Sequence, residues 1–579
     1  MMHATHTQKS ELPRWRLVVT ATFFCVCGVG LIGRLYVLQI IEHSDYLAAA
    51  ERSSVVRHEV VPKRGEIFFN DKNGVLLPVA INKQIPSAYV VPREVQESGA
   101  DGAQVAEKIA TALSLDPADV LARVSIPGDP YEPLKKRLTE EEATSVEALG
   151  ITGVHIQKTW DRSYPLGDIG AQTIGFLGFE GADRAGQYGV EGFYDAQLQG
   201  QRGIFSGALD GLGRLIPFGN KTVKPMDNGD DIVLTLDQNV MFSVRDMLKE
   251  LNQKYRPMSV SALVMNPKTG AVIAMDSLPS FDPNTYADVK NPQLFLNPLV
   301  HIPFEPGSVM KPIAMAAGLD TGVVTPESTF NDDKGYTVVA DRVIRNAENK
   351  VFGVVTMTDI LKNSINTGIM YVQQKIGKEL FLEYMEKFGF ARTTGIDIAA
   401  EKQGSIANLY TNRDVNYATA AFGQGISVTP VQLLSAINAI ANEGNIMKPH
   451  VIAATIHNDV ETAFEPVVTG RAISADTANR LTAMMVTIVD DGQARGAKVL
   501  NYFIAGKTGT AQVPVPGGYA DDRTIHTYVG FAPAFDPRFS IAIKLEAPSD
   551  IEFASQSVAP SFGKLAKFLL DYYQIPPER

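Results

Sequence analysis

The stretch EPGSVMKP, residues Glu305–Pro312, decides how this chain of 579 residues is interpreted. The segment Ser308–Leu319 (SVMKPIAMAAGL) consists mostly of residues that favour helices. Pro312 falls within the first turn or so, where a missing N–H group costs least. The pattern therefore predicts a helix over residues 308–319, with Ser308 at its N-terminus and Lys311 one turn away on the same face.

This spacing allows nucleophilic chemistry but does not by itself establish it. A serine hydroxyl is a poor nucleophile until a base takes its proton. A lysine can be that base only when neutral, which requires its pKa to fall by roughly 3 units, or about 4 kcal/mol, through burial or nearby cations. Free N–H groups at a helix N-terminus can also hold an oxyanion. Taken alone, S-x-x-K equally describes an N-capped helix with an exposed lysine.

Two further motifs change that balance. Ser364-Ile365-Asn366 supplies a hydroxyl and an amide two residues apart, which can point into one cleft. Lys507-Thr508-Gly509-Thr510 stands at the predicted start of a strand. Its glycine permits close backbone approach, and its lysine and hydroxyls can hold a carboxylate. A phosphate-binding loop is a weak alternative, since the G-x-x-x-x-G-K-[ST] frame is missing.

Composition excludes several classes of function. Hydrophobic content of 45% and charged content of 20% are ordinary for a folded globular protein. The net charge of -11, without a long basic run, argues against nucleic acid as the main partner. The two cysteines, Cys25 and Cys27, lie in an apolar run, so we expect no disulfide framework. The nine histidines are scattered without paired spacing, so we expect neither a metal site nor a cofactor.

The N-terminal region predicts a membrane anchor. The uncharged run Leu17–Gly33 continues after Arg34 into the apolar segment Leu35–Ile41. Charged residues separate this run from the candidate A-x-A cleavage site, so we expect residues 17–41 to be an uncleaved single-pass helix rather than a signal peptide. Basic residues before the run predict a cytoplasmic tail, residues 1–16, and an extracytoplasmic location for the rest of the chain.

Residues 50–225 are interpreted as an extended, β-rich stalk or interaction module. A strand is expected at Val55–Val61 and a helix at Gly102–Leu113, where apolar residues share one face. The glycine-dense segment Gly186–Gly213 predicts loops and tight turns. No cluster of titratable residues in this region suggests chemistry.

A polar turn, residues 224–231, marks the expected boundary to a second domain, residues 230–579. Its beginning and end are rich in predicted strands, and a long helical stretch separates them. This arrangement predicts an α+β domain whose terminal segments share one sheet. The expected elements are a strand at Ile232–Leu236, a helix at Asn239–Tyr255, hairpins at Val260–Met275 and Tyr528–Leu545, and an amphipathic helix at Ser561–Tyr573.

The three motifs, in this order, resemble those of the penicillin-recognising serine acyltransferases, whose signature is S-x-x-K, S-D-N and K-T-G. This chain has Ser-Ile-Asn, and Ser-x-Asn is the form common among penicillin-binding proteins. Other segments resemble the class B penicillin-binding proteins, and together they cover nearly the whole chain. These segments are Arg64–Ile67, Asp71–Gly74, Arg162–Pro165, Gly189–Glu191, Gly200–Gly203 and Phe422–Pro430.

The resemblance implies a multi-domain protein. Its α+β transpeptidase domain would have the penicillin-binding and serine β-lactamase fold, an antiparallel sheet flanked by helices with an all-helical subdomain. That domain would follow the stalk and the single transmembrane helix. The implied activity is a monofunctional peptidoglycan D,D-transpeptidase that β-lactams inhibit covalently, with no glycosyltransferase module.

The resemblance also implies roles for individual residues. Ser308 would attack the D-Ala–D-Ala amide of a donor stem peptide, and Lys311 would take its proton. Ser364 would relay a proton to the leaving amine, with Lys507 keeping Lys311 neutral by like-charge repulsion. Asn366, Thr508, Gly509 and Thr510 would bind the donor, the two threonines through its carboxylate. The N–H groups of Ser308 and Thr510 would form the oxyanion hole.

Several alternatives remain open at this point. Length and motif spacing favour a division-type enzyme over an elongation-type one. A β-lactamase or β-lactam sensor, a D,D-carboxypeptidase and an inactive scaffold are the other candidates. The partners implied are nascent peptidoglycan stem peptides, a membrane polymerase of the SEDS class and division scaffold proteins, in a bacterial cytoplasmic membrane with the catalytic domain outside.

Overall fold

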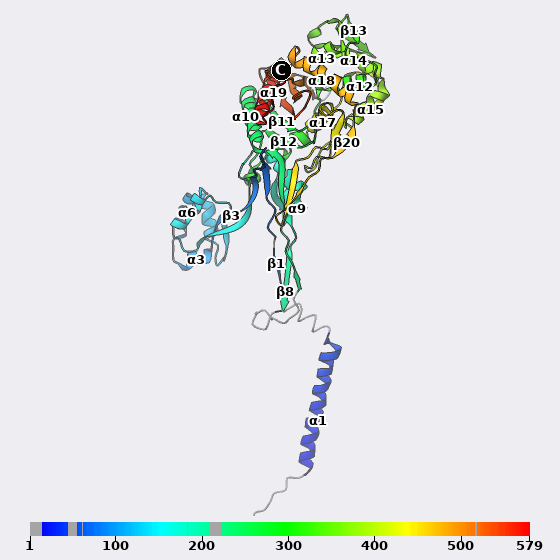
Figure 1. Cartoon of the computed structure of the whole chain (residues 1–579). Helices are drawn as coiled ribbons and strands as arrows, with labels where there is room; N and C mark the ends of the chain where they lie inside the picture. Colours follow the sequence, from blue (N-terminus) through cyan, green and yellow to red (C-terminus); the bar gives the residue numbers. More distant parts are fainter. Residues whose placement is uncertain (1–13, 44–54, 61, 182, 209–221, 516–517) are drawn as a thin grey trace, which may run out of the picture. The chain divides into compact units, whose positions relative to one another are not determined.

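A computed structural model describes residues 14–43, 55–60, 62–181, 183–208, 222–515 and 518–579 (Figure 1). The chain divides into two compact units, which we describe separately. The first combines residues 1–63 with residues 200–228, and the second combines residues 64–199 with residues 229–579.

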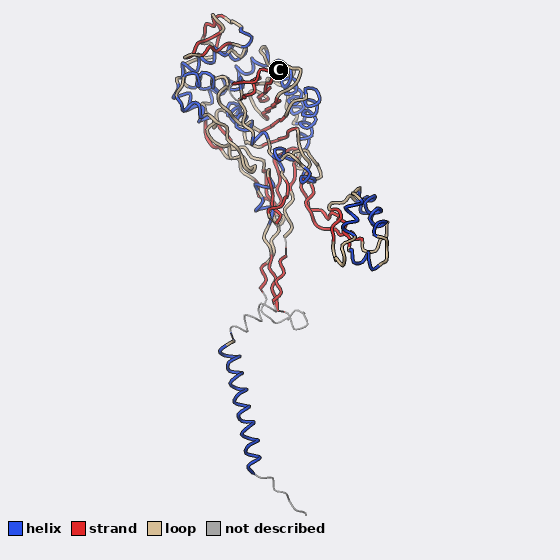
Figure 2. Tube along the Cα trace, turned by 180° about the vertical axis from the view of Figure 1, so that it is seen from behind, coloured by secondary structure: helices blue, strands red, loops and turns tan. Residues whose placement is uncertain are grey.

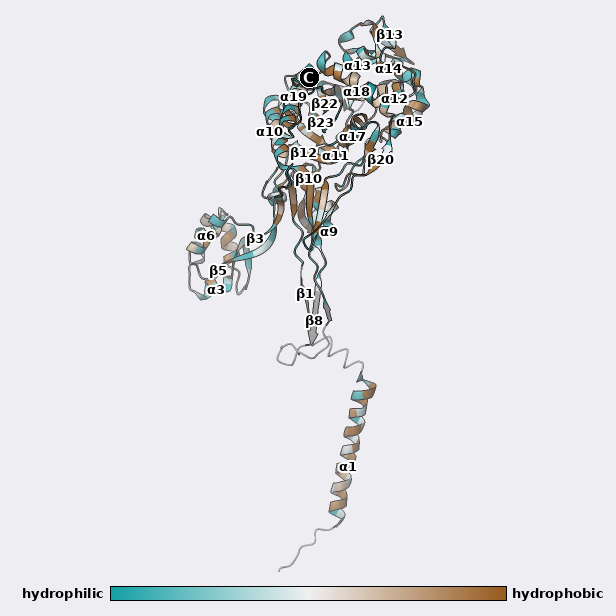
Figure 3. Cartoon of the chain, in the orientation of Figure 1, coloured by the Kyte–Doolittle hydropathy of each residue, from teal (hydrophilic) through white to brown (hydrophobic). Residues whose placement is uncertain are grey.

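The first unit contains the predicted anchor helix and a small sheet. Helix α1 (Arg14–Tyr36) continues into a π-helical turn, Val37–Ile41. Within the described residues, Trp15–Ile41 is the one helix long and apolar enough to cross a membrane, and its side chains are mostly exposed. Figure 3 shows α1 coloured as hydrophobic over much of its length. The sheet is antiparallel, in the order β1 (Val55–Val60), β8 (Gly203–Ala208) and β9 (Thr222–Lys224). The predicted strand thus forms, and its last residue, Val61, lies outside the described residues.

A five-stranded antiparallel sheet forms the centre of the second unit. The strand order is β12-β11-β23-β22-β21. The first two strands precede the helical stretch in sequence and the other three follow it, so the predicted sharing of one sheet is confirmed. Helices α10 and α19 pack against each other and against strands of this sheet, and α11, α17 and α18 also contact the sheet. Figure 2 shows helices (blue) around the strands (red) in this part of the chain. The bounds are β11 Ser259–Met265, β12 Val272–Leu278, β21 Ala505–Val515, β22 Gly518–Ala532, β23 Phe539–Glu546, α10 Gln238–Tyr255, α11 Pro298–His301, α17 Pro430–Ala441, α18 Ala475–Asp490 and α19 Ala554–Tyr572.

The sequence explains why these elements form. The side chain of Asp237 accepts hydrogen bonds from the N–H groups of Asn239 and Val240, which caps the start of α10. Strand β11 is covered on both faces, so its residues are apolar almost without alternation, as expected for a central strand.

The long segment between β12 and β21 is mainly helical but also carries short strand pairs. Three two-stranded antiparallel sheets, β13–β16, β14–β15 and β17–β20, are inserted among its helices. The bounds are α12 Lys311–Asp320, α13 Met357–Lys362, α14 Asn366–Ile376, α15 Lys378–Lys387, α16 Asp414–Ala420, β13 Thr329–Asp332, β14 Tyr336–Val339, β15 Arg342–Arg345, β16 Gly353–Thr356, β17 Asn445–Met447 and β20 Val468–Arg471; short 3-10 turns lie at Pro283–Asp288, Pro292–Phe295, Ala347–Asn349, Ala407–Thr411 and Arg495–Ala497.

A second, seven-stranded sheet joins segments from both ends of this unit. Its order is β19-β18-β10-β2-β3-β4, and β5 pairs with β3. Strand β10 lies between β2, to which it is parallel, and β18. The far ends of β3 and β5 meet helices α3 to α6 in a separate hydrophobic core. The bounds are β2 Ile67–Asn70, β3 Leu77–Val90, β4 Glu132–Lys135, β5 Val154–Ser163, β10 Asp231–Asp237, β18 Ile452–His457, β19 Val460–Ala463, α3 Pro92–Glu97, α4 Gly102–Leu113, α5 Pro117–Val124 and α6 Glu140–Ala148.

The prediction of loops over Gly186–Gly213 is wrong for most of its described residues. The segment contains the end of β7 (Asp183–Gln187, paired with β6, Phe176–Glu180), short helices α8 (Gly189–Phe193) and α9 (Asp195–Gln199), and β8; α7 (Ala171–Ile174) packs against α8. The glycines here permit close packing. A Cβ atom on Gly186 would lie 1.9 Å from the carbonyl oxygen of Glu191, and one on Gly189 would lie 2.4 Å from that of Thr173.

The C-terminal helix also begins earlier than predicted. Helix α19 starts at Ala554 and passes through Pro560, whereas the sequence placed its start at Ser561. A proline usually marks a helix boundary because its ring removes one backbone hydrogen bond. Here the apolar face continues before the proline, since Ala554 and Val558 are as completely buried as Phe562. Packing of that face on the sheet overrides the local penalty.

Candidate active site

Ser308 lies on a short 3-10 turn, Gly307–Met310, and α12 begins at Lys311. The predicted helix over residues 308–319 is therefore a 3-10 turn followed by an α-helix. The N–H group of Lys311 donates to the carbonyl oxygen of Ser308, an i to i+3 bond. Pro312 then occupies the first turn of α12, where no N–H donor is needed. The side chain of Ser308 is half-buried.

Close backbone packing holds this turn in place. Gly307 adopts a left-handed conformation, with φ of 61°, and its N–H group donates to the carbonyl oxygen of Gly423 over 3.0 Å. A Cβ atom on Gly423 would lie 2.2 Å from the carbonyl oxygen of Gly307. The loop Phe422–Gly425 therefore packs directly against the backbone of the serine turn. A side chain at Gly423 would not fit between the two backbones.

The KTG segment flanks the same turn. Strand β21 is the edge strand of the five-stranded sheet. A Cβ atom on Gly509 would lie 3.0 Å from both the carbonyl oxygen of Pro306 and Cγ1 of Val309. The third motif thus lies directly beside the residues that surround Ser308, as the sequence predicted for a shared cleft.

Lys311 is completely buried among residues of the second motif. Its Nζ atom lies 3.0 Å from Oγ of Ser364 and 2.7 Å from Oδ1 of Asn366, and it also contacts the carbonyl oxygen of Ser364. Burial lowers the pKa of Lys311 well below its ordinary value, and the nearby charge of Lys507 lowers it further. Both effects shift the amine of Lys311 towards its neutral form.

Lys507 approaches Ser364 from the sheet. Its Nζ atom lies 3.0 Å from Oγ of Ser364 and 2.9 Å from the carbonyl oxygen of Thr508. Burial lowers the pKa of Lys507 to about 7. The Ser364 hydroxyl consequently contacts both lysine amines, so it can pass a proton between them.

The junction between α13 and α14 positions the second motif. Ser364 has a φ of 55°, a left-handed conformation that costs a residue other than glycine about 1–3 kcal/mol. Asn366 is the first residue of α14, and its Nδ2 atom donates to the carbonyl oxygen of Arg345 over 3.0 Å. The Asn366 side chain thus spans from Lys311 to β15.

A buried polar network stabilises this junction, and the sequence analysis missed it. Thr367 Oγ1 donates to Oδ1 of Asp332 over 2.9 Å, and Thr367 N donates to Oδ1 of Asn346 over 3.0 Å. Asn346 Nδ2 in turn donates to Oδ2 of Asp332 over 2.9 Å. All three residues are buried. No sequence signal marks them, because they come from segments that meet only in the folded chain.

The two threonines of the third motif differ in exposure. Thr508 is buried, and Thr510 is half-buried. Oγ1 of Thr510 accepts a hydrogen bond from the N–H group of Ala554, at the start of α19, over 3.1 Å. Because this oxygen is already an acceptor, the Thr510 hydroxyl proton is available for a ligand.

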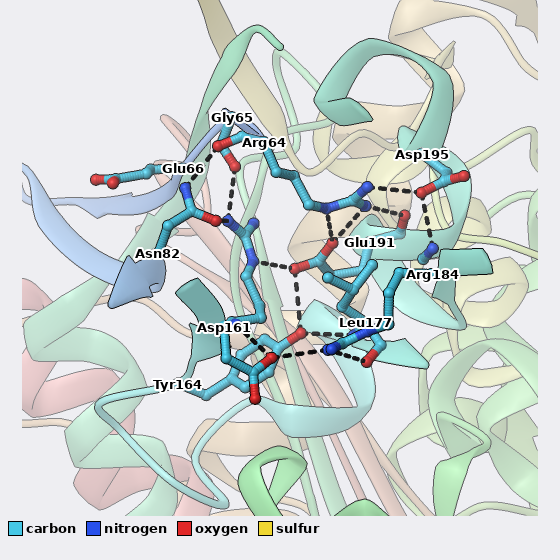
Figure 4. A network of polar contacts seen from close by, with 12 residues as sticks. Arg64, Gly65, Glu66, Asn82, Asp161, Tyr164, Leu177, Arg184, Glu191 and Asp195 are labelled. Carbon is cyan, nitrogen blue, oxygen red and sulfur yellow. Dashed lines mark hydrogen bonds and ion pairs between the residues drawn. The ribbon is translucent and has the colours of Figure 1, made fainter. Parts of the chain in front are cut away.

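A second buried cluster lies in the part of the chain where the sequence suggested no titratable cluster (Figure 4). The carboxylate of Glu191 accepts from Nη2 of Arg64 over 2.6 Å and from Nε of Arg162 over 2.7 Å. The Tyr164 hydroxyl donates to Oε1 of the same carboxylate over 3.2 Å. Both arginines and Glu191 lie in segments on which the family resemblance rests. That resemblance was the sequence signal that could have pointed to this cluster. We interpret this cluster as structural, since it is fully buried.

Metal ligands are absent from the part of the chain that the structure describes. Among those residues, no group of three or more His, Cys, Asp or Glu side chains is arranged to hold a metal ion.

Comparison with known proteins identifies both halves of the chain. Residues 260–567 match the family model described as the penicillin binding protein transpeptidase domain, and residues 59–234 match the penicillin-binding protein dimerisation domain. Stage V sporulation protein D of Bacillus subtilis is 31% identical over 572 residues, covering 98% of this chain and 87% of that protein. The probable peptidoglycan D,D-transpeptidase PbpC of Pseudomonas aeruginosa is also 31% identical, over 574 residues, covering 98% of this chain and 97% of that protein.

Solved structures agree with these relatives. Penicillin binding protein 3 of Mycobacterium tuberculosis, in complex with aztreonam, is 26% identical and has a TM-score of 0.68. The match covers 90% of this chain and 98% of that one. With both domain models matched and the three motifs gathered around one turn, the chain belongs to the class B penicillin-binding proteins.

Proposed function

We propose that this chain is a serine-type peptidoglycan D,D-transpeptidase, which cross-links stem peptides through an acyl-enzyme on Ser308. The observation that supports the proposal most is the pair of 3.0 Å contacts from Ser364 Oγ to the Nζ atoms of Lys311 and Lys507. Both amines are buried and have lowered pKa values. Such an arrangement suits proton transfer near neutral pH.

Acylation begins with Lys311 as a neutral amine. Such an amine has two N–H groups, which can donate to Oδ1 of Asn366 and the carbonyl oxygen of Ser364, and one lone pair. The lone pair accepts the Ser308 proton as Oγ of Ser308 bonds to the carbonyl carbon of the terminal D-Ala–D-Ala amide. The Ser364 hydroxyl then gives its proton to the leaving D-alanine amine as the C–N bond breaks, and it regains a proton from Lys311, with Lys507 supplying positive charge nearby.

Residues around the cleft bind and polarise the donor. Asn366 keeps one N–H of its amide for the donor backbone, since the other donates to Arg345. The hydroxyls of Thr508 and Thr510 bind the terminal carboxylate, and Gly509 lets the strand approach closely. The backbone N–H groups of Ser308 and Thr510 donate to the developing oxyanion, which stabilises the transition state more than the substrate.

The second half of the reaction removes the acyl group from Ser308 and regenerates the free enzyme. An amine from another stem peptide attacks the acyl carbon and loses a proton to Lys311, which passes a proton to the Ser308 oxygen as the acyl–oxygen bond breaks. A β-lactam takes the donor's place and leaves Ser308 acylated. Penicillin binding protein 3 of Mycobacterium tuberculosis has been solved in complexes with aztreonam and ampicillin, which agrees with this assignment.

Fluorescent penicillin tests the role of Ser308. The Ser308→Ala variant is expected to lose covalent labelling completely, because the attacking oxygen is gone, while thermal unfolding stays close to that of the wild type. Labelling is measured on denaturing gels with the full chain in detergent. Full labelling of the variant would refute the assignment.

The lifetime of the acyl-enzyme distinguishes the proposal from a β-lactamase or a β-lactam sensor. A transpeptidase is expected to keep the acyl group for hours, and a β-lactamase to release it within milliseconds. Supplying a stem-peptide donor with an amine acceptor then separates transpeptidation, which gives a cross-linked product, from D,D-carboxypeptidation, which gives only D-alanine release.

We propose a cellular setting for the same activity. Residues 1–16 form a cytoplasmic tail, residues 17–41 a single-pass anchor, residues 50–225 a stalk or dimerisation domain, and residues 230–579 the extracytoplasmic transpeptidase domain. The partners proposed are a SEDS-class membrane polymerase and division scaffold proteins. Replacing residues 14–41 by an unrelated transmembrane helix tests the anchor, since a polymerase contact through it predicts lost growth support.

We favour division over elongation as the role of this enzyme. Depletion of the protein in its host is expected to produce filaments, whereas spheres would indicate the elongation role. Such depletion can be read by microscopy.

A further inference from the structure

We propose that Glu305 is a positioning residue for acylation: its carboxylate fastens the loop Phe422–Gly425 and strand β22 to the turn that carries Ser308. The inference rests on the proposed function of Ser308. It concerns how the reactive turn is held, and it assigns Glu305 no contact with the substrate.

Both oxygens of the Glu305 carboxylate are occupied. Oε1 accepts a hydrogen bond from the N–H group of Gly425 over 3.1 Å, and Oε2 accepts one from the hydroxyl of Tyr519 over 3.1 Å. Glu305 stands three residues before Ser308 and is half-buried. A single side chain thus joins the serine turn to two segments that are distant from it in sequence.

The bond between Gly425 and Glu305 is one of several hydrogen bonds that join residues 304–307 to residues 423–428. Phe304 and Val428 exchange two backbone hydrogen bonds of 2.9 Å each, and Gly307 N donates to Gly423 O over 3.0 Å. The bond from Gly425 to Glu305 lies between these two positions in sequence. Loop and serine turn are therefore joined at three points, of which only one depends on a side chain that can be replaced.

The contact with Tyr519 joins the turn to the KTG strand. Tyr519 lies in β22 and pairs with Pro514 of β21, in the same hairpin that carries Lys507–Thr510. Holding Tyr519 against Glu305 therefore restrains where β21 lies relative to Ser308. The oxyanion donors proposed at Ser308 and Thr510 come from these two segments, so their separation depends on this restraint.

Burial of the Glu305 carboxylate costs free energy, which its two hydrogen bonds must offset. Burial raises the pKa of Glu305, although the bonds from Tyr519 and Gly425 partly offset that effect. Burial and the charge of Glu305 also raise the pKa of Tyr519 to about 12. Neither partner of the carboxylate is a cation, so the hydrogen bonds must compensate for its desolvation.

Three variants of the full chain test the proposal through the acylation kinetics of a β-lactam. Glu305→Ala removes both contacts, and Tyr519→Phe removes one. Glu305→Gln keeps an acceptor for Gly425 and an amide that can bond to the Tyr519 oxygen. The matched control is Tyr410→Phe, which removes a tyrosine–glutamate hydrogen bond of 2.8 Å between Tyr410 and Glu386, on an exposed surface.

The expected result is a loss in the rate constant of acylation rather than in noncovalent affinity. Glu305→Ala should lower that rate constant by about tenfold or more, since small misplacements of reacting groups are this costly. Glu305→Gln should stay within about threefold of the wild type, because it can keep both contacts, and Tyr519→Phe should fall between the two Glu305 variants, because it removes one of the two contacts. Tyr410→Phe should not differ from the wild type, and final labelling should be complete in every variant.

Three outcomes would overturn the proposal: a wild-type acylation rate in Glu305→Ala, a wild-type rate in Tyr519→Phe, or the same loss in Glu305→Gln as in Glu305→Ala. If Glu305→Ala does not fold, Tyr519→Phe decides the question: a wild-type rate overturns the proposal, and a slower rate than that of Glu305→Gln supports it. Failure of the proposed function would be seen separately, as labelling of Ser308→Ala.

Discussion

The hydroxyl of Ser364 lies between two buried amines, and this arrangement sets the protonation states of the site. Burial alone lowers the pKa values of both Lys311 and Lys507, and the charge of Lys507 adds to the effect at Lys311. Since a second positive charge close to the first is unfavourable, a charge on Lys507 disfavours protonation of Lys311. In the mechanism that we propose, the reactive state has a neutral Lys311 and a charged Lys507.

This state predicts a bell-shaped dependence of β-lactam acylation on pH. The rate should fall at low pH because Lys311 becomes protonated, and fall above about pH 7 because Lys507 loses its proton. In Lys507→Arg the guanidinium stays charged, so the alkaline decline should move to a pH above roughly 10. Acylation rates measured from pH 5 to pH 10 would check this, and an unchanged alkaline decline in the variant would contradict it.

The identity of these residues was predictable from the sequence, but their surroundings were not. Ser308, Lys311, Ser364, Asn366 and Lys507–Thr510 belong to short local motifs. The residues that hold them, such as Glu305, Asp332 and Asn346, act through partners far away in sequence. A motif marks candidate groups for chemistry, whereas folding decides which neighbours restrain them.

Strand β21 and the serine turn are packed so closely that a side chain larger than that of Gly509 would force one of them to shift. A Cβ atom on Gly509 would lie 3.0 Å from Pro306 O, a backbone atom that cannot move freely. Gly509→Ala is expected to push the strand away from Ser308 and to slow acylation by about tenfold or more, with labelling kinetics as the measurement. Gly470→Ala in β20 is the control, because a Cβ atom there meets nothing within 4 Å. Equal rates in the two variants would contradict the packing argument.

The start of α14 depends in the same way on Thr367 and Asp332. Thr367→Val removes the hydroxyl that donates to Oδ1 of Asp332, and it leaves a buried carboxylate with one donor fewer. We expect a loss of about 1–3 kcal/mol in stability and slower acylation, because Asn366 precedes Thr367 directly. Thr367→Ser should restore both.

Thermal unfolding and labelling kinetics of these Thr367 variants provide the measurement. Thr111→Val is a suitable control, since the Thr111 hydroxyl donates to a backbone carbonyl on an exposed face of α4. If Thr367→Val unfolds at the same temperature as Thr111→Val, the network does not stabilise this junction.

The bounds of a helix were predictable where the local sequence pattern and the tertiary packing favour the same start and end. The helix over Gly102–Leu113 was predicted with its observed bounds, because Val105, Ile109 and Leu113 all face one core. The start of α19 was missed because packing overrides the local effect of Pro560. The glycines near residue 189 were interpreted as signs of loops and tight turns, although they permit close contact between backbones.

The assembly of the whole chain depends on strands that pair across long separations. Strand β10 lies between β2 and β18, so residues near 67, 232 and 454 form one sheet. Neither strand order nor parallel pairing can be derived from periodicity, which reports only the type of each element. The cluster around Glu191 has the same character, since residues 64, 162 and 191 meet only in the folded unit.

Removing the charge of Glu191 tests how much this cluster contributes to the stability of the second unit. Glu191→Gln leaves Arg64 and Arg162 buried with less counter-charge, and losses of about 3–5 kcal/mol are typical when one partner of a buried ion pair is removed. We expect calorimetric unfolding to begin several degrees lower. Asp550→Asn, which removes an exposed ion pair with Arg256, should cost less than about 1 kcal/mol.

The pH dependence of the stability lost in Glu191→Gln shows whether the charge of Glu191 or its packing stabilises the second unit. Burial alone would raise the pKa of Glu191, but the charges and hydrogen bonds of Arg162 and Arg64 outweigh it, so the pKa is lowered below 4.5. A carboxylate with a depressed pKa contributes stability that is complete above its unfolded-state pKa and is lost as the pH falls through its folded-state value. The difference between the wild type and Glu191→Gln should therefore be constant from pH 7 to about pH 5 and should narrow at lower pH. A difference that stays the same below pH 4 would mean that shape rather than charge makes Glu191 necessary.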